Sequence, residues 1–240
     1  MENKYNYTEY HKTKNIGKDY DEKLYSVDGW SSRIWEIEKF LLKRILSKIK
    51  PSSIMDFAAG TGRVSKYLEE IKFKNITAVD SSQEMLSMAQ NKLKSTKILC
   101  CDITKEKNRN RIKEKFDVIL AFRFFLNADK PLRENVIRQL NKLLKNDGRL
   151  IFNIHQNKHS IMYIKNLIRR KKNTLSVKDI RNLLKIGDFE IEEIYSYGFI
   201  PHWRKRQLLK FDDWIKVEKK LISKKILLGT HLMAVAKKRK

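Results

Sequence analysis

The sequence lacks the features that mark a disulfide-stabilised, metal-stapled or membrane-spanning protein. It has two cysteines, Cys100 and Cys101, which are adjacent and follow a short apolar run. Neighbouring cysteines are a poor arrangement for a disulfide and too few for a structural zinc site. No segment approaches the roughly 18 apolar residues of a membrane span, and residues 1–25 lack the apolar core of a signal peptide. We therefore expect a cytoplasmic protein without a bound metal.

Internal repeats and low-complexity tracts are also absent. A chain of 240 residues is long enough to bury one good hydrophobic core, with some residues left for an arm and for insertions. We therefore expect one domain over residues 51–240, preceded by an N-terminal arm and helix over residues 1–50. The insertions are expected at 161–175 and 199–228.

Acidic residues are scarce compared with basic ones. The chain has 28 Asp and Glu against 53 Lys and Arg, which gives a formal net charge of +25. Such a field would attract RNA, anionic membrane surfaces and phosphorylated small molecules alike. A solvated lysine-rich surface without a specific partner has the same composition. The charge by itself therefore leaves the partner open.

The most informative segment present is IMDFAAGTGR at 54–63, followed by ITAVD at 76–80. It predicts a buried strand, a glycine turn that opens a helix, and a second strand ending in a carboxylate, which is the layout that holds an adenosine-containing cofactor. Gly60 and Gly62 let a ligand approach the backbone, and Asp80 can accept hydrogen bonds from both ribose hydroxyls. Alternatively, the glycines only make a tight turn and Asp80 caps the next helix.

The residues around the glycines separate two kinds of nucleotide site. A dinucleotide fingerprint favours a small residue such as Gly or Ala where Ser65 stands, and it usually has no acid at the position of Asp56. Asp56 followed by Ala58-Ala59-Gly60-Thr61-Gly62 resembles the first motif of class I S-adenosylmethionine-dependent methyltransferases, in which an acid precedes a small-rich glycine loop. The resemblance implies S-adenosyl-L-methionine as the cofactor.

Strand and helix patterns alternate along the rest of the chain. Further strands are expected at 97–101, 116–122, 149–154, 189–197 and 231–237, and helices at 132–144 and 176–185. This alternation predicts an α/β fold with a Rossmann-like, doubly wound sheet of seven strands and helices on both faces. The sheet is expected to be mostly parallel with an antiparallel C-terminal strand, because the last strand pair resembles the tail hairpin of this methyltransferase class.

Ligands of such folds bind beyond the carboxyl ends of the strands. The resemblance implies that Asp102 contacts the adenine amino group, although an Asp at the end of a strand is also a common turn residue. Arg123 and Asn127 are expected to hold the substrate or the methionine end of the cofactor, or to cap the next helix. The expected cofactor residues on this edge are Asp56, Ala58, Gly60, Gly62, Asp80, Ser81, Met85, Asp102, Ile103, Ala121 and Arg123.

The N-terminal arm supports the comparison with small-molecule methyltransferases. A helix is expected from about Trp30 to Ile49. In glycine N-methyltransferase and its relatives, an arm of similar pattern folds over the cofactor, and an Arg at the place of Arg33 grips the methionine carboxylate through a bidentate pair. The alternative is an ion pair between Arg33 and Glu36 on the helix surface. Tyr25 and Trp30 are expected either as lid aromatics or as core residues.

The chemistry of methyl transfer needs in-line positioning, a dry pocket and, for a hydroxyl acceptor, a group that removes its proton. Two of the chain's five histidines, His155 and His159, follow the expected fifth strand. Imidazole titrates near neutral pH, so we expect His155 as the general base and His159 as the second choice. His155 as a packing residue bonded to a loop carbonyl is equally compatible with the pattern.

The segment 121–127, AFRFFLN, resembles the corresponding loop of small-molecule methyltransferases, including those of ubiquinone and menaquinone biosynthesis. It lacks the [DNS]-P-P-[YFW] pattern of enzymes that methylate nucleobase amino groups. We expect O-methylation of a small molecule or of a phosphorylated or lipid-linked glycan precursor, with the insertions as a substrate lid and with peripheral membrane contact compatible with the charge. The alternatives are an RNA methyltransferase and a non-catalytic S-adenosylmethionine-binding protein. The sequence leaves the oligomeric state open.

Overall fold

The computed structural model describes residues 29–160, 173–200 and 209–239 of the chain. These residues form one seven-stranded sheet with the order β3-β2-β1-β4-β5-β7-β6. Strands β1 to β5 run parallel, and β7 runs antiparallel to both β5 and β6. The strands are β1 (Ile54–Phe57), β2 (Ile76–Asp80), β3 (Lys97–Cys100), β4 (Phe116–Ala121), β5 (Leu144–Ile154), β6 (Phe189–Tyr197) and β7 (His231–Lys238).

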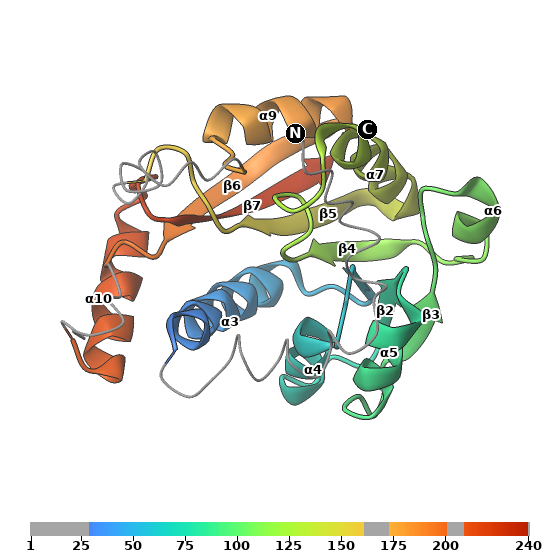
Figure 1. The fold of residues 1–240 in the computed structure, drawn as a ribbon, viewed down its shortest axis with the longest axis horizontal. Helices are drawn as coiled ribbons and strands as arrows, with labels where there is room; N and C mark the ends of the chain where they lie inside the picture. The colour runs from blue at the N-terminus through green and yellow to red at the C-terminus, as the bar shows by residue number, and fades with distance from the viewer. Residues whose placement is uncertain (1–28, 161–172, 201–208, 240) are drawn as a thin grey trace, which may run out of the picture.

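Helices cover both faces of this sheet, as Figure 1 shows: α7 and α9 lie above it in the view, and α3, α4 and α5 lie below it. The helices are α3 (Trp30–Ile49), α4 (Arg63–Glu70), α5 (Gln83–Gln90), α6 (Glu106–Arg109), α7 (Lys130–Leu143), α9 (Val177–Ile186) and α10 (Phe211–Ser223). The predicted Rossmann-like architecture, with its antiparallel C-terminal strand, is therefore confirmed. None of the helices in the described ranges is long and apolar enough to cross a membrane.

Local signals explain most helix ends. Ser176 and Asp179 form a reciprocal capping box at the start of α9, and Gly187 follows its last residue. The helix α7 begins two residues earlier than expected, because the Asp129 side chain accepts a hydrogen bond from the Leu132 N–H at 2.9 Å and Pro131 fits the first turn.

The start of β5 differs from the prediction. The turn expected at 146–148, before the strand, lies within it, since Leu144 already pairs with Phe116 of β4. The pairing of β4 with β5 shifts its register between Phe116 and Val118, and Asp147 has a φ of 63°. The segment is thus an irregularity inside a longer strand.

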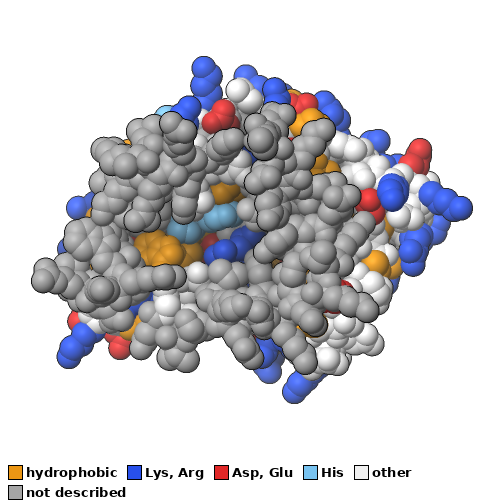
Figure 2. Space-filling view, viewed as in Figure 1, with side chains coloured by type: hydrophobic (Ala, Val, Ile, Leu, Met, Phe, Trp, Pro, Cys, Tyr) orange, Lys and Arg blue, Asp and Glu red, His pale blue; other side chains and the backbone are white. Residues whose placement is uncertain are grey.

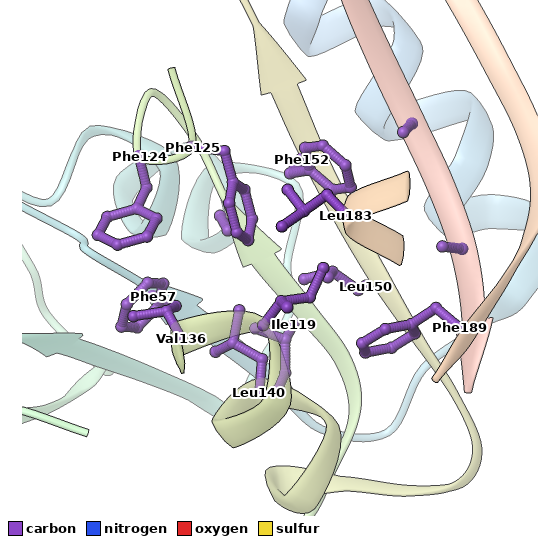
Figure 3. Close-up of a cluster of buried hydrophobic side chains, with 14 of the residues drawn as sticks. Phe57, Ile119, Phe124, Phe125, Val136, Leu140, Leu150, Phe152, Leu183 and Phe189 are labelled. Atoms are coloured by element: carbon purple, nitrogen blue, oxygen red, sulfur yellow. The ribbon is translucent and has the colours of Figure 1, made fainter. Parts of the chain in front are cut away.

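The core consists of two clusters, one on each face of the sheet. The first packs β1, β4, β5 and β6 against α7 and α9, and Figure 3 shows its Phe57, Phe125, Phe152 and Phe189 side chains facing helix residues such as Leu140. The second packs the opposite face against α3, α4 and α10. Because burying one Leu or Phe side chain stabilises the fold by roughly 1.5–3 kcal/mol, these clusters fix the strand ends that carry the site.

The amphipathic helix expected within 199–228 corresponds to α10, which packs on α3 and β6. Its Trp214 and Ile222 are buried in the second cluster, and the Trp214 ring meets the Trp30 ring edge-on at 5.8 Å. These side chains therefore close the core, and Trp30 packs against them. Tyr25, Trp203 and the segment 161–172 lie outside the described residues, and the lid role of both insertions stays a prediction.

Candidate functional site

A cavity opens at the carboxyl ends of β1, β2, β3 and β4, where the sequence predicts the cofactor. The loops that follow these strands, with one side of α7, form its wall. The lining residues are Asp56, Phe57, Ala58, Ala59, Gly60, Thr61, Arg63, Val64, Asp80, Ser81, Ser82, Met85, Cys101, Asp102, Ile103, Thr104, Phe122, Arg123, Phe124, Leu132 and Val136. They include nine of the predicted cofactor residues and leave out Gly62, Ala121 and Arg33.

The glycine loop after β1 has the left-handed backbone that the motif predicts. Gly60 has a φ of 56° and Gly62 a φ of 79°, and the loop begins at Ala58, whose φ of 55° is unusual for a residue with a Cβ. A Cβ on Gly62 would lie 3.0 Å from atoms of Ala89 and Leu93. Gly62 therefore lets the start of α4 pack closely against the α5 region, whereas Gly60 faces the cavity.

Asp80 joins the first two loops of the site. Its Oδ2 accepts a hydrogen bond from the Gly60 N–H at 2.8 Å, and its Oδ1 accepts one from the Ser82 N–H at 2.9 Å. Ser82, and not Asp80, caps α5, because the Ser82 hydroxyl accepts from the Met85 N–H. The alternative in which Asp80 is a helix cap is therefore wrong. The two backbone contacts instead hold the carboxylate at the cavity wall.

Asp56 lies almost fully buried at the cavity floor and ties β1 to α4. One of its oxygens accepts hydrogen bonds from the Ser65 N–H at 3.0 Å and from the Ser65 hydroxyl at 2.7 Å. Burial raises the pKa of Asp56 to about 6, although both Ser65 bonds and the Arg63 charge oppose the rise. Ser65 thus has a specific role at the position where a dinucleotide loop favours glycine.

Asp102 both lines the cavity and makes a turn. Its Oδ1 accepts hydrogen bonds from the Thr104 hydroxyl at 2.6 Å and the Thr104 N–H at 3.1 Å, which is the turn geometry considered as the alternative. The neighbouring Ile103 is buried against the first core cluster and lines the same part of the cavity. The turn therefore holds Asp102 at the wall.

Arg33 is buried, with 1% exposure, in the contact between α3 and α10. Its Nη1 donates to the Leu209 carbonyl at 3.5 Å, and its guanidinium lies over the Phe211 ring, 5.1 Å from the centroid. The alternative surface pair with Glu36 is wrong, because Glu36 bonds Lys39 at 2.7 Å instead. Arg33 does not line the cavity described above, so its contact with the cofactor stays a prediction.

A different arginine, Arg63, lines the cavity at the start of α4. Its guanidinium lies 4.0 Å from the centroid of the Trp35 ring, and its Nη1 lies 3.8 Å from Oε2 of Glu38. Arg63 is not among the residues predicted from the sequence. The available signal was its position directly after Gly62, where a side chain at the first turn of the helix faces the ligand.

The loop after β4 is held by amide side chains. Arg123 has a φ of 59°, and its N–H donates to Oδ1 of Asn153 at 2.6 Å. The Asn127 side chain donates to the Arg123 carbonyl at 2.6 Å. Since Asp129 caps α7, neither Arg123 nor Asn127 is a helix cap. Ala121, the last residue of β4, is fully buried in the first core cluster and supports the loop from behind.

A buried acid, Glu38 of α3, anchors the other side of this edge. It is 0% exposed, and its Oε1 accepts hydrogen bonds from Asn153 Nδ2 at 2.6 Å and from the Tyr197 hydroxyl at 2.8 Å. Burial and the nearby Glu38 raise the pKa of Tyr197 well above its usual value, so its hydroxyl stays a donor. Glu38 thus connects α3 through Asn153 to the backbone of Arg123.

The two predicted bases occupy different environments. His155 directly follows β5, is partly exposed, and interacts electrostatically with the buried His231 of β7. His159 is exposed, and its backbone N–H donates to Asn157 Oδ1 at 3.1 Å. Figure 2 shows a hollow in which histidine side chains lie beside Lys or Arg and hydrophobic side chains. The described residues contain no cluster of three or more side chains suited to hold a metal.

Comparisons with known proteins agree with this geometry. Residues 55–150 match the family model of a methyltransferase domain. The chain is 28% identical over 123 residues to a demethylmenaquinone methyltransferase of Thermotoga maritima. The aligned region covers 51% of this chain and 48% of that protein. The chain therefore spans about half the length of the curated relatives it matches.

Solved structures resemble the whole fold. An S-adenosylmethionine-dependent methyltransferase of Clostridium acetobutylicum has a TM-score of 0.61 at 20% identity and covers 93% of this chain and 98% of its own. The magnesium protoporphyrin IX methyltransferase of Synechocystis, solved with bound S-adenosylhomocysteine (SAH), has a TM-score of 0.62 at 14% identity, with 97% of both chains covered. At these identities the likeness shows the fold. Residues 55–150 therefore resemble a methyltransferase domain, and the chain as a whole has the fold of S-adenosylmethionine-dependent methyltransferases.

Proposed function

We propose that this protein transfers a methyl group from S-adenosylmethionine to a hydroxyl of a small molecule or of a phosphorylated or lipid-linked glycan precursor. The observation that carries the proposal is the cavity wall at Gly60 and Asp80, where bare backbone meets a carboxylate fixed by two N–H donors. The relative named for demethylmenaquinone supports a small-molecule acceptor.

The residues present fit the adenosyl part of the cofactor. A side chain at Gly60 would combine a φ of 56° with a position at the cavity wall, so glycine suits a ligand held against the backbone. Asp80 is a suitable partner for ribose hydroxyls, and Asp102 for the adenine amino group. Met85 and Ile103 give the same stretch of wall apolar surface for the base.

We assign the methionine end to the arginine side of the cavity. Arg63 and Arg123 both line it, and Arg63 is steadied by the Trp35 ring and by Glu38. A guanidinium can form two parallel hydrogen bonds with a carboxylate, which suits the amino-acid end of the cofactor. Arg33, which the resemblance implies for this role, remains a second candidate that would act from α3.

The acceptor is proposed to bind beside Arg123, at the carboxyl end of β5. When bound, S-adenosylmethionine supplies a methyl group already activated by its sulfonium charge. His155 is proposed to take the proton of the acceptor hydroxyl as the new oxygen–carbon bond forms and the sulfur–carbon bond breaks. His159 is the second candidate base. The N-terminal arm and the insertions at 161–175 and 199–228 are proposed to cover the site and exclude water.

The proposal is tested by a methyl-transfer screen with tritium-labelled S-adenosylmethionine. Quinone precursors, glycan precursors and bulk RNA serve as separate acceptors. We expect label in a hydroxyl-bearing small molecule, loss of SAH binding in Asp80→Ala, and lost turnover with retained binding in His155→Ala. Label in RNA alone would overturn the acceptor class. Retained SAH binding without turnover on any acceptor would instead support a non-catalytic binding protein.

A further inference from the structure

Three strands bring polar side chains to one point of the sheet, next to the proposed acceptor position. The β5–β7 ladder ends at the pair of Ile154 and Leu232, and His155 and His231 are the residues next to that pair. His155 acts electrostatically on His231. In the β6–β7 pairing His231 lies opposite Tyr197. The two imidazoles therefore lie near one another at this end of the sheet.

The hydrogen bonds of Thr230 fix the tautomer of His231. The Thr230 hydroxyl donates to the Gly198 carbonyl at 2.9 Å, which uses its one proton. The contact of 2.8 Å between the same hydroxyl oxygen and Nδ1 of His231 must then be donated by the ring. We assign the proton of the neutral ring to Nδ1, which leaves Nε2 as a hydrogen-bond acceptor.

The surroundings keep this ring in place and neutral. His231 is 5% exposed and stacks on the Tyr197 ring, with centroids 5.2 Å apart and planes at 30°. Burial, then the neighbouring His155 and Arg123, lower the pKa of His231 well below its usual value. The Nε2 atom therefore remains an acceptor at neutral pH, and His155 is the more exposed of the two imidazoles.

We propose that His231 is a specificity-determining residue that accepts a hydrogen bond from a second hydroxyl of the acceptor, next to the hydroxyl whose proton goes to His155. One hydroxyl has one proton and cannot donate to both rings, so two imidazoles near one another suit a molecule with two neighbouring hydroxyls. The substrate class is thus a vicinal diol, either a catechol or a sugar diol. This inference rests on the proposed methyl transfer to oxygen.

The test compares catechol with phenol as probes, with the full chain saturated with SAH and kept under argon. Binding is measured by calorimetry, and ring-¹⁵N-histidine NMR reports which ring nitrogen responds. We expect catechol to bind at least about tenfold tighter than phenol, with the His231 Nε2 signal shifted by catechol. His231→Gln should remove the preference. Thr230→Val should weaken the preference for catechol, because the proton of His231 is then no longer held on Nδ1. Thr230→Ser, which keeps the hydroxyl, should retain the preference.

Several results would overturn the inference. These are equal binding of the two probes, no binding of either, a proton on Nε2 of the unliganded ring, or an unchanged preference in His231→Gln. SAH affinity is measured in every variant and should stay within about twofold of the wild type, since His231 and Thr230 do not line the cofactor cavity. If the wild type does not bind SAH, the proposed function itself is contradicted. Failure of the proposed function is therefore distinguishable from failure of this inference.

Discussion

The cofactor half and the acceptor half of the site lie at the ends of different strands and are built in different ways. The cofactor half, after β1, β2 and β3, consists of short loops in which backbone N–H groups bond nearby carboxylates, as between Gly60 and Asp80. The acceptor half, at the ends of β5, β6 and β7, is built from side chains that meet from distant parts of the chain, as between Glu38 and Tyr197. The contacts of the cofactor half join residues of one local motif, whereas the contacts of the acceptor half form only when the chain has folded.

This difference also affects how mutations of each half change the stability of the fold and the affinity for the cofactor. In the cofactor half Asp80 and Asp102 are partly exposed, and Asp80 accepts its hydrogen bonds from the backbone N–H groups of Gly60 and Ser82. In the acceptor half Glu38 is taken fully out of water, and its partners repay the desolvation cost only while all of them are present. We therefore expect mutations of the acceptor half to act first on stability, and mutations of the cofactor half to act first on affinity.

The largest expected effect is on stability, in Glu38→Ala. The substitution leaves the Tyr197 hydroxyl and the Asn153 amide buried without their acceptor, which should cost about 3–5 kcal/mol of unfolding free energy. Urea denaturation measures it. As a matched control, Glu36→Ala removes an acid of the same helix whose ion pair with Lys39 is partly exposed, and it should cost less than about 1 kcal/mol. Equal losses in both variants would contradict the buried anchor.

The next effect is on cofactor affinity, in Asp80→Asn. An amide offers one acceptor oxygen where the carboxylate offers two, so it cannot hold the Gly60 and Ser82 N–H groups and also bind ribose. SAH affinity should fall about 100-fold, as measured by calorimetry, which corresponds to roughly 3 kcal/mol. Asp213→Asn on the exposed side of α10 is the control. A change of less than threefold in Asp80→Asn would remove Asp80 from the site.

A smaller effect separates the two arginines. Arg63→Met should weaken SAH binding by about 10- to 30-fold, since it removes a charge that lines the cavity, whereas Arg33→Met should change it by less than about threefold. Calorimetry on both variants gives the comparison directly. The reverse order would show that α3 supplies the carboxylate clamp, as the family resemblance implies.

The smallest effect concerns pH and the loop before β3. Glu69 accepts hydrogen bonds from the backbone of Lys94, Ser95 and Thr96, and these bonds lower its pKa to about 2 despite partial burial. Since the folded pKa is depressed, this stabilisation is present above pH 4.5 and is lost as the pH falls toward 2. Glu69→Gln should cost about 1 kcal/mol at pH 7, because solvent screens the carboxylate.

The free energies of unfolding of the wild type and of Glu69→Gln, measured with urea, should become equal as the pH is lowered from 7 toward 2. The exposed neighbour Glu70 gives a control, since Glu70→Gln should have little effect at either end of this range. A cost that is independent of pH would mean that the Glu69 charge does not hold the loop.

Local sequence predicted much of this molecule. The positions of the strands follow from alternating apolar runs, and the start of α9 at Ser176 follows from a residue type that favours helix caps. The cavity residues near Gly60 were predictable because the turn, the helix start and the next strand are contiguous in the chain. The partner of Asp56 was not predicted, since the pattern shows Ser65 only as a replacement for a glycine.

Pairings across long sequence separation could not be predicted. Nothing near Glu38 indicates that Asn153 and Tyr197 will meet it, and helical spacing alone does not separate a buried acid from a solvated one. Arg33 matched a family pattern but packs under α10, whose position depends on the finished core. The approach of His155 to His231 could not be predicted without the pairing of β5 with β7, which ends at Ile154 and Leu232.

Calorimetric titration of the wild-type chain with SAH, and separately with NAD⁺, tests the central claim most directly. The site at Gly60, Asp80 and Asp102 should bind one SAH per chain and give no heat with NAD⁺. Binding of NAD⁺ in its place, or no binding of SAH by a folded chain, would contradict the account.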